Sequence, residues 1–124
     1  LILIDLNKLL TDEEWMELEG YVDSQYPAGD PEWNSTGLRG FDAGFHLKSA
    51  SGWETGGNGD DAYGFTGLPG GDTFGGITIG GIWWTSSESD ENYSINRFLW
   101  SIYDGSIREI KEKGYGYSVR CVKN

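Results

Sequence analysis

The N-terminal part of the chain carries one clear helical pattern. Residues 11–14 (Thr-Asp-Glu-Glu) have the spacing of a capping box, in which the threonine hydroxyl accepts a hydrogen bond from the backbone N–H three residues on. Trp15, Leu18 and Val22 follow at intervals of three and four residues, which places them on one face of a helix. Residues 27–29, with a proline and a glycine, are expected to end it.

Residues 31–81 show no helical or strand period. Gly, Asn, Asp and Ser are dense here, which is typical of a long ordered loop, and one short helical turn is expected within residues 41–49. Isolated aromatic residues in such loops often anchor irregular backbone onto a core. Those expected to do so are Trp33, Phe45, Trp53, Tyr63, Phe65 and Phe74. Among them, Trp33 stands in a polar stretch and is the residue most expected to contact a ligand instead.

Apolar and aromatic residues alternate in the last third of the chain, which favours β-strands. Strands are expected at residues 82–86, 95–103, 106–111 and 115–121. Asp104 and Gly105 are the residues that a tight hairpin turn requires. The pattern predicts a three- or four-stranded antiparallel meander, and together with the helix it predicts an α+β domain.

Length and charge limit the class of protein. The 124 residues, of which 20 are glycine, are expected to form a single domain over 1–124 with many turns. The formal net charge of −11 repels phosphate backbones, so nucleic acid is not an expected partner. The opening apolar run, residues 1–4, is too short to span a bilayer, so we expect a strand there and no membrane insertion.

The sequence indicates no catalytic centre, and we expect a protein that is not an enzyme. His46 is the only histidine and has no serine or cysteine nucleophile signature around it, so it is interpreted as a surface or capping residue. Cys121 is the only cysteine, which excludes an internal disulfide and a thiolate metal cluster. It is expected to be a small core residue on the last strand.

Two short runs are dense in oxygen ligands: residues 58–61 (Asn-Gly-Asp-Asp) and residues 88–92 (Glu-Ser-Asp-Glu-Asn). Such side chains suit a hard cation or the hydroxyl groups of a sugar. Neither run has the spacing of a known calcium loop, so no cofactor is expected, with a structural calcium ion as the alternative. The candidate ligand-binding residues are Trp33, Asn58, Asp60, Asp61, Asp90 and Asn92.

Five blocks of the chain, in this order, resemble the Fibrobacter succinogenes major paralogous domain. They are residues 11–15 (TDEEW), 47–53 (LKSASGW), 64–71 (GFTGLPGG), 83–88 (WWTSSE) and 117–122 (YSVRCV). The resemblance implies a C-type lectin-like fold, with a helix packed on a small antiparallel sheet and long loops offering the binding surface. It also implies an exported or surface-attached bacterial protein, with a distant likeness to formylglycine-generating and sulfatase-modifying proteins.

The departures from these relatives restrict what carries over. The calcium-dependent sugar motifs of lectins, Glu-Pro-Asn or Gln-Pro-Asp, are absent, and one cysteine cannot supply the reactive pair that the enzyme relatives need. Before residue 11 the chain also lacks the Cys-Pro and Gly-Trp-Arg-Leu-Pro segments of the family. The resemblance implies that the missing cysteine would pair with Cys121 and that an upstream part of the domain is absent.

These observations favour a recognition or adhesion module, extracellular or attached to a bacterial cell surface, that binds a glycan or a surface protein. Trp33 is expected to stack on a sugar ring while the oxygen-rich side chains accept hydrogen bonds from hydroxyl groups. The alternative is a structural or assembly domain of a larger surface complex or lipoprotein. The oligomeric state is left open.

Overall fold

Two helices, one 3-10 turn and a four-stranded sheet make up the fold in the computed structural model, which describes residues 9–71 and 75–117. The elements in chain order are α1 (Asp12–Val22), η1 (Pro31–Asn34), β1 (Gly37–Arg39), α2 (Ala43–Leu47), β2 (Gly80–Glu88), β3 (Tyr93–Trp100) and β4 (Ser106–Glu112). The predicted α+β class is confirmed. Within the described ranges, none of the helices has the length and apolar character needed to cross a membrane.

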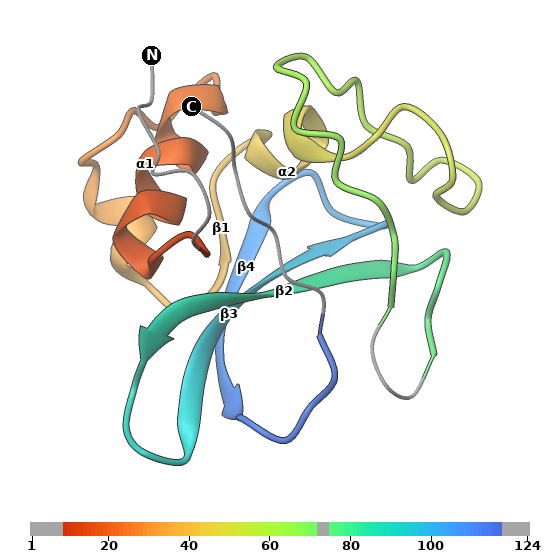
Figure 1. Ribbon diagram of the computed structural model, residues 1–124. Coiled ribbons are helices and arrows are strands. Elements are labelled where there is room, and N and C mark those ends of the chain that lie inside the picture. Colours follow the sequence, from red (N-terminus) through yellow and green to blue (C-terminus); the bar gives the residue numbers. More distant parts are fainter. Residues whose placement is uncertain (1–8, 72–74, 118–124) are drawn as a thin grey trace.

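The sheet has the order β1-β4-β3-β2, and every neighbouring pair is antiparallel. β2, β3 and β4 form the predicted meander, whereas β1 joins the other edge of β4 by pairing Leu38 with Ile107. In Figure 1, α1 lies beside the sheet, α2 lies at its upper end and the turn between β2 and β3 lies at its lower end. The loops therefore gather at two separate ends of the molecule.

The capping box that the sequence predicts is present at the start of α1. The backbone N–H of Glu14 donates to Thr11 Oγ1 at 3.0 Å, and the N–H of Thr11 donates back to Glu14 Oε1 at 2.9 Å. The helix ends at Val22, earlier than expected from residues 27–29. It stops there because Asp23 is extended and its carboxylate accepts the next backbone N–H groups, those of Gln25 and Tyr26.

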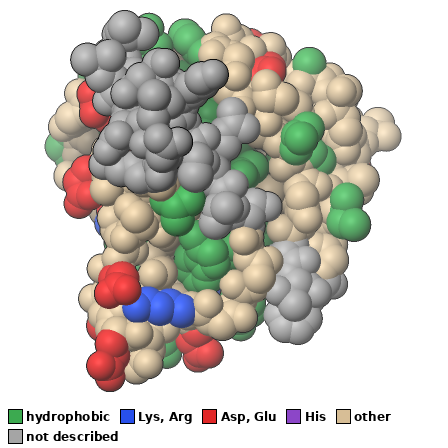
Figure 2. Space-filling model, in the orientation of Figure 1, with side chains coloured by type: hydrophobic (Ala, Val, Ile, Leu, Met, Phe, Trp, Pro, Cys, Tyr) green, Lys and Arg blue, Asp and Glu red, His purple; other side chains and the backbone are tan. Residues whose placement is uncertain are grey.

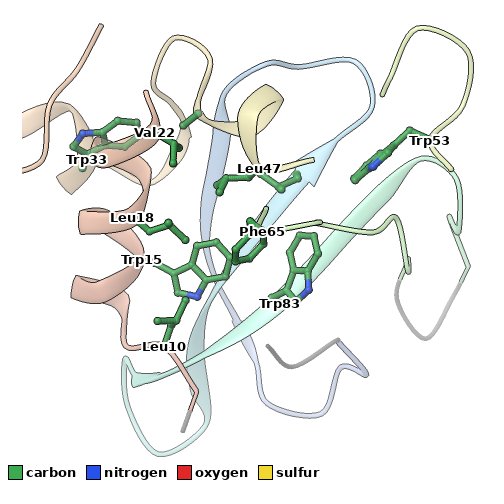
Figure 3. Close-up of a cluster of buried hydrophobic side chains, with 11 residues drawn as sticks. Leu10, Trp15, Leu18, Val22, Trp33, Leu47, Trp53, Phe65 and Trp83 are labelled. Carbon is green, nitrogen blue, oxygen red and sulfur yellow. The ribbon is translucent and has the colours of Figure 1, made fainter. Parts of the chain in front are cut away.

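The apolar face of α1 packs on the sheet through large aromatic rings. Trp15, Leu18 and Val22 are buried as predicted. Figure 3 shows Trp15 next to Phe65 and Trp83, between α1 and β2. The ring of Trp15 meets Phe65 edge-on at 5.5 Å and Trp83 at 6.3 Å between centroids. Such pairs add about 0.5–1.5 kcal/mol each beyond their area burial.

The aromatic residues of the long loop divide into anchors and exposed rings. Trp53 and Phe65 are buried, as predicted for anchors, and the Trp53 indole N–H donates to Ser49 Oγ at 3.1 Å. Phe45 is half-buried. The same prediction is wrong for Tyr63, which is 54% exposed, because its ring packs only on other surface rings. Phe74 lies outside the described residues.

Several expected strand boundaries need correction. The three-residue strand β1 falls within the segment expected to be loop, and β3 ends at Trp100 rather than at residue 103. The connection to β4 is longer than a tight turn because the Lys48 ammonium donates to the carbonyls of Trp100 and Tyr103, at 3.2 and 3.1 Å. Residues 115–117 are not a strand. The expected strand at residues 1–4 and the position of Cys121 lie outside the described residues.

Buried charges join α1 to three strands of the sheet. The Glu19 carboxylate, which is 0% exposed, accepts two hydrogen bonds from Arg39 at 2.9 Å and one from Arg97 at 3.1 Å. Asp12 pairs with Arg97 at 2.8 Å and with Arg108 at 2.7 Å. Burial by itself raises the pKa of Asp12, but the hydrogen bonds and charges of the two arginines outweigh it and hold that pKa below its usual value. The network fixes the position of α1 on the sheet.

Candidate functional site

Two exposed tyrosine rings lie beside a histidine and two carboxylates at the α2 end of the molecule. Tyr21, from the last turn of α1, is 48% exposed and meets Tyr63 of the long loop edge-on, with 5.6 Å between ring centroids. The His46 ring lies 6.2 Å from Tyr63. We call the surface formed by Tyr21, Asp42, His46, Asp60 and Tyr63 the Tyr–His–Asp surface.

Both ring nitrogens of His46 face a carboxylate. Nε2 lies 3.1 Å from Asp42 Oδ2, and Nδ1 lies 3.0 Å from each oxygen of Asp60. Burial by itself lowers the pKa of His46, but the hydrogen bond to Asp60 and the charge of Asp42 outweigh it, so the pKa is raised above its usual value. The arrangement therefore favours an imidazolium that neutralises part of the negative charge around it.

Asp42 reaches His46 because Asp23 caps α2 in its place. The Asp23 carboxylate oxygen Oδ2 accepts the N–H groups of Phe41, Asp42 and Ala43 at 2.8–3.0 Å. The Asp42 side chain makes no cap of its own and instead accepts the backbone N–H and the hydroxyl of Ser24, at 2.8 and 2.6 Å. Asp42 thus ties the end of α1 to the start of α2.

Asp60 is placed by close backbone contact between the long loop and α2. The N–H groups of Gly59, Asp60 and Asp61 donate to the carbonyls of Ser49, Phe45 and Lys48 at 3.0–3.1 Å. A Cβ atom at Gly59 would lie 2.1 Å from the carbonyl oxygen of Phe45, so only glycine permits this approach.

Trp33 does not belong to a ligand site, and the prediction that it stacks on a sugar is wrong. It is 1% exposed and lies beside α1 (Figure 3). Its indole N–H donates to the carbonyl of Pro27 at 3.1 Å, the Arg39 guanidinium covers its ring, and Tyr26 meets it edge-on. Because the residues around Trp33 in the sequence are polar, the sequence alone did not indicate that Trp33 is a core residue.

The oxygen-rich run at residues 58–61 is engaged mainly in holding its own loop. Asn58 Oδ1 accepts the N–H of Trp53 at 3.0 Å, and Asp61 accepts the N–H and hydroxyl of Thr66 at 2.6 and 2.7 Å. Of the three candidate residues in this run, Asp60 alone contacts His46. Across residues 9–71 and 75–117, no group of three or more His, Cys, Asp or Glu side chains is arranged to hold a metal ion.

Asp90 and Asn92 lie at the other end of the sheet, in the turn between β2 and β3 (Figure 1). Asp90 Oδ1 accepts the N–H groups of Asn92 and Tyr93 at 2.8 and 2.9 Å, which closes the turn. Asn92 also lines an open hollow of about 470 Å³. Lys113, in the same hollow, pairs with Glu88 at 2.8 Å, and Figure 2 shows basic and acidic side chains together over this lower end. The structure thus separates the two predicted groups.

Tyr21, Asp42, His46 and Tyr63 were not among the predicted site residues, because they come from three separate parts of the chain. One signal was present in the sequence. Tyr21 falls outside the Trp15–Leu18–Val22 face of the predicted helix, so it had to be an aromatic ring on the solvent side.

Comparison with known proteins identifies a family but gives no relative of known activity. Residues 8–123 match the family model described as the Fibrobacter succinogenes major domain. No curated protein and no solved structure matches the chain. Because the family match spans nearly the whole sequence, the chain belongs to the Fibrobacter succinogenes major domain family, which indicates a bacterial origin.

Proposed function

We propose that this protein is a non-catalytic, extracellular recognition module of C-type lectin-like fold, which binds a glycan through the Tyr–His–Asp surface. The observation that carries the proposal is the placement of two exposed tyrosine rings next to two carboxylates that a histidine holds in position. Aromatic faces stack on the apolar C–H faces of sugars, while carboxylate oxygens accept hydrogen bonds from hydroxyl groups.

The surface is held in shape before any ligand arrives. Asp42 is bound to Ser24, the Asp60 segment is bound to carbonyls in and directly after α2, and Tyr21 stands on a helix that buried ion pairs fix to the sheet. A preorganised surface loses little conformational entropy on binding, which raises affinity for a ligand that makes few contacts.

The same contacts favour binding over catalysis at His46. The hydrogen bonds of its ring in the described structure go to Asp42 and Asp60, not to a serine or cysteine nucleophile. A general base needs one nitrogen free of a proton and directed at its substrate. An imidazolium held between two carboxylates instead orients them, so the proposal assigns His46 a positioning role.

A second candidate function, assembly within a larger surface complex or lipoprotein, is favoured by the outer face of the sheet. Leu38, Ile107, Phe98 and Ile82 are cross-strand neighbours in one row over all four strands. They lie on the face opposite α1, because side chains alternate along a strand and Arg97 points toward the helix. Leu38, at the end of this row, is 50% exposed.

A glycan array followed by affinity measurements tests the first proposal. Removing the ring in Tyr21→Ala or Tyr63→Ala is expected to weaken binding roughly tenfold, about 1.4 kcal/mol. Tyr93→Ala is the matched control, because Tyr93 is a partly exposed tyrosine at the opposite end of the sheet. Equal affinity of the wild type and both ring variants would exclude this surface. Leu38→Ser is expected to bind the glycan normally, and loss of partner assembly in that variant would favour the second function.

A further inference from the structure

The His46 ring lies where three segments of the chain meet. His46 itself belongs to α2, Asp42 ties α2 to the end of α1 through Ser24, and Asp60 belongs to the long loop that carries Tyr63. The exposed ring of Tyr63 packs against His46 on one side and Tyr21 on the other. The contact between Asp60 and His46 is therefore one of those that hold Tyr63 in position.

The contacts of the His46 ring with Asp42 and with Asp60 are both attractive only when the ring carries both protons. A neutral imidazole has one N–H, so one of its nitrogens would turn a lone pair toward a carboxylate at 3.0–3.1 Å. The titratable groups near the ring are Asp42 at the start of α2, Asp60 and Tyr63 of the loop, and Tyr21 of α1 behind Tyr63. In the described ranges no lysine or arginine pairs with either aspartate.

Lys48, the basic residue nearest in sequence, cannot replace the histidine. Its ammonium is turned away and donates to the carbonyls of Trp100 and Tyr103. When His46 loses its proton, its ring therefore offers a single N–H donor to two negatively charged carboxylates.

We propose that His46 is a proton-dependent latch, which holds the Asp60–Tyr63 segment against α1 and α2 when charged and releases it when neutral. Its effect on ligand binding rests on the proposed function, because the latched segment carries half of the tyrosine pair. Glycan binding is then strongest in mildly acidic solution and weakens as the pH rises.

The sign of the effect follows from the direction of the pKa shift. The pKa of His46 is raised in the folded protein, so its contribution to stability is fully present below the ordinary histidine value of about 6.5. That contribution is lost as the pH rises through the folded pKa. The opposite order, with release in acid, would require a lowered pKa.

NMR titration of the His46 ring in the protein without ligand tests the latch. We expect the ring to titrate above the ordinary histidine value and the amide protection factors of residues 59–63 to fall about fivefold or more over the same pH range. In Asp60→Asn the midpoint is expected to move down. In His46→Gln, whose side chain still donates but does not titrate, the protection factors should show no step. A ring that titrates at or below the ordinary value, or protection factors that do not follow the ring, would overturn the latch.

Binding measurements across the same pH range separate the latch from the proposed function. Glycan affinity of the wild type is expected to fall about fivefold as the ring loses its proton, while that of His46→Gln stays constant. A constant wild-type affinity would overturn the effect on binding. Failure to find any bound glycan would count against the proposed function, and the ligand-free titration would still decide the latch.

Discussion

The side chain of Asp23 helps to place Asp42 on the Tyr–His–Asp surface, although Asp23 is not part of that surface. Its two carboxylate oxygens accept the backbone N–H groups of Gln25, Tyr26, Phe41, Asp42 and Ala43. Burial by itself raises the pKa of Asp23, but these backbone hydrogen bonds outweigh it and hold the pKa below its usual value. The carboxylate both ends α1 and starts α2, and it leaves Asp42 free to meet His46.

Replacing Asp23 with alanine is expected to destabilise the protein by at least about 2 kcal/mol, because several N–H groups lose their acceptor at once. Urea unfolding at neutral pH measures this. Glu17→Ala is the control, since Glu17 is an exposed acid on the same helix. Because the folded pKa of Asp23 is lowered, its contribution is present above about 3.8 and is lost as the pH falls through the folded pKa. Equal unfolding midpoints for the two variants would contradict this role.

Among the secondary-structure elements, the contact between the long loop and α2 is the one that places Asp60 beside His46. Gly59 passes so close to the carbonyls of Phe45 and Lys48 that a Cβ atom there would lie 2.1 and 2.5 Å from their oxygens. Both obstacles are backbone atoms, so no side-chain rotation relieves the overlap. The loop has to move away if residue 59 gains a side chain, and Asp60 moves with it.

Gly59→Ala is therefore expected to separate Asp60 from His46 and to abolish the upward shift of the His46 titration, with a loss of stability of about 1–3 kcal/mol. NMR titration of the ring and urea unfolding report the two effects. Gly56→Ala is a useful comparison, because no atom lies within 4 Å of a Cβ atom there, although its positive φ adds backbone strain. A Gly59→Ala protein with an unchanged ring titration would show that the contact does not place Asp60.

The elements that sequence pattern predicted are those whose signals are local. The capping box at Thr11, the aromatic run in β2 and the alternation in β3 need only neighbouring residues to be recognised. β1 has three residues and exists because Leu38 pairs with Ile107, far along the chain, so no local pattern marks it. The length of the β3–β4 connection depends on the ammonium of Lys48, which is also distant in sequence.

The site was predicted only in part, for the same reason. Composition marked residues 58–61 as oxygen-rich and so included Asp60, but it grouped them with Asp90 and Asn92, which the fold places at the other end of the sheet. A run of oxygen ligands does not reveal whether its oxygens face solvent or bind backbone N–H groups. Asn58 and Asp61 do the latter.

In the molecule as a whole, buried ion pairs link the core to the Tyr–His–Asp surface. Glu19 of α1 is held by Arg39 from β1 and Arg97 from β3, so the helix that carries Tyr21 cannot rotate without breaking these bonds. Removing one partner of a buried ion pair costs about 3–5 kcal/mol, because the other charge stays buried. The sheet, α1 and the long loop therefore act as one frame around the tyrosine pair.

Chemical-shift mapping with a glycan selected by the array is the most direct test of the proposed binding surface, because it locates the ligand without altering any residue. If the proposal holds, the largest changes fall on the residues of the Tyr–His–Asp surface: Tyr21, Asp42, His46, Asp60 and Tyr63. Changes centred on the hollow around Asn92 and Lys113 at the opposite end of the sheet, with the Tyr–His–Asp surface unaffected, would contradict it.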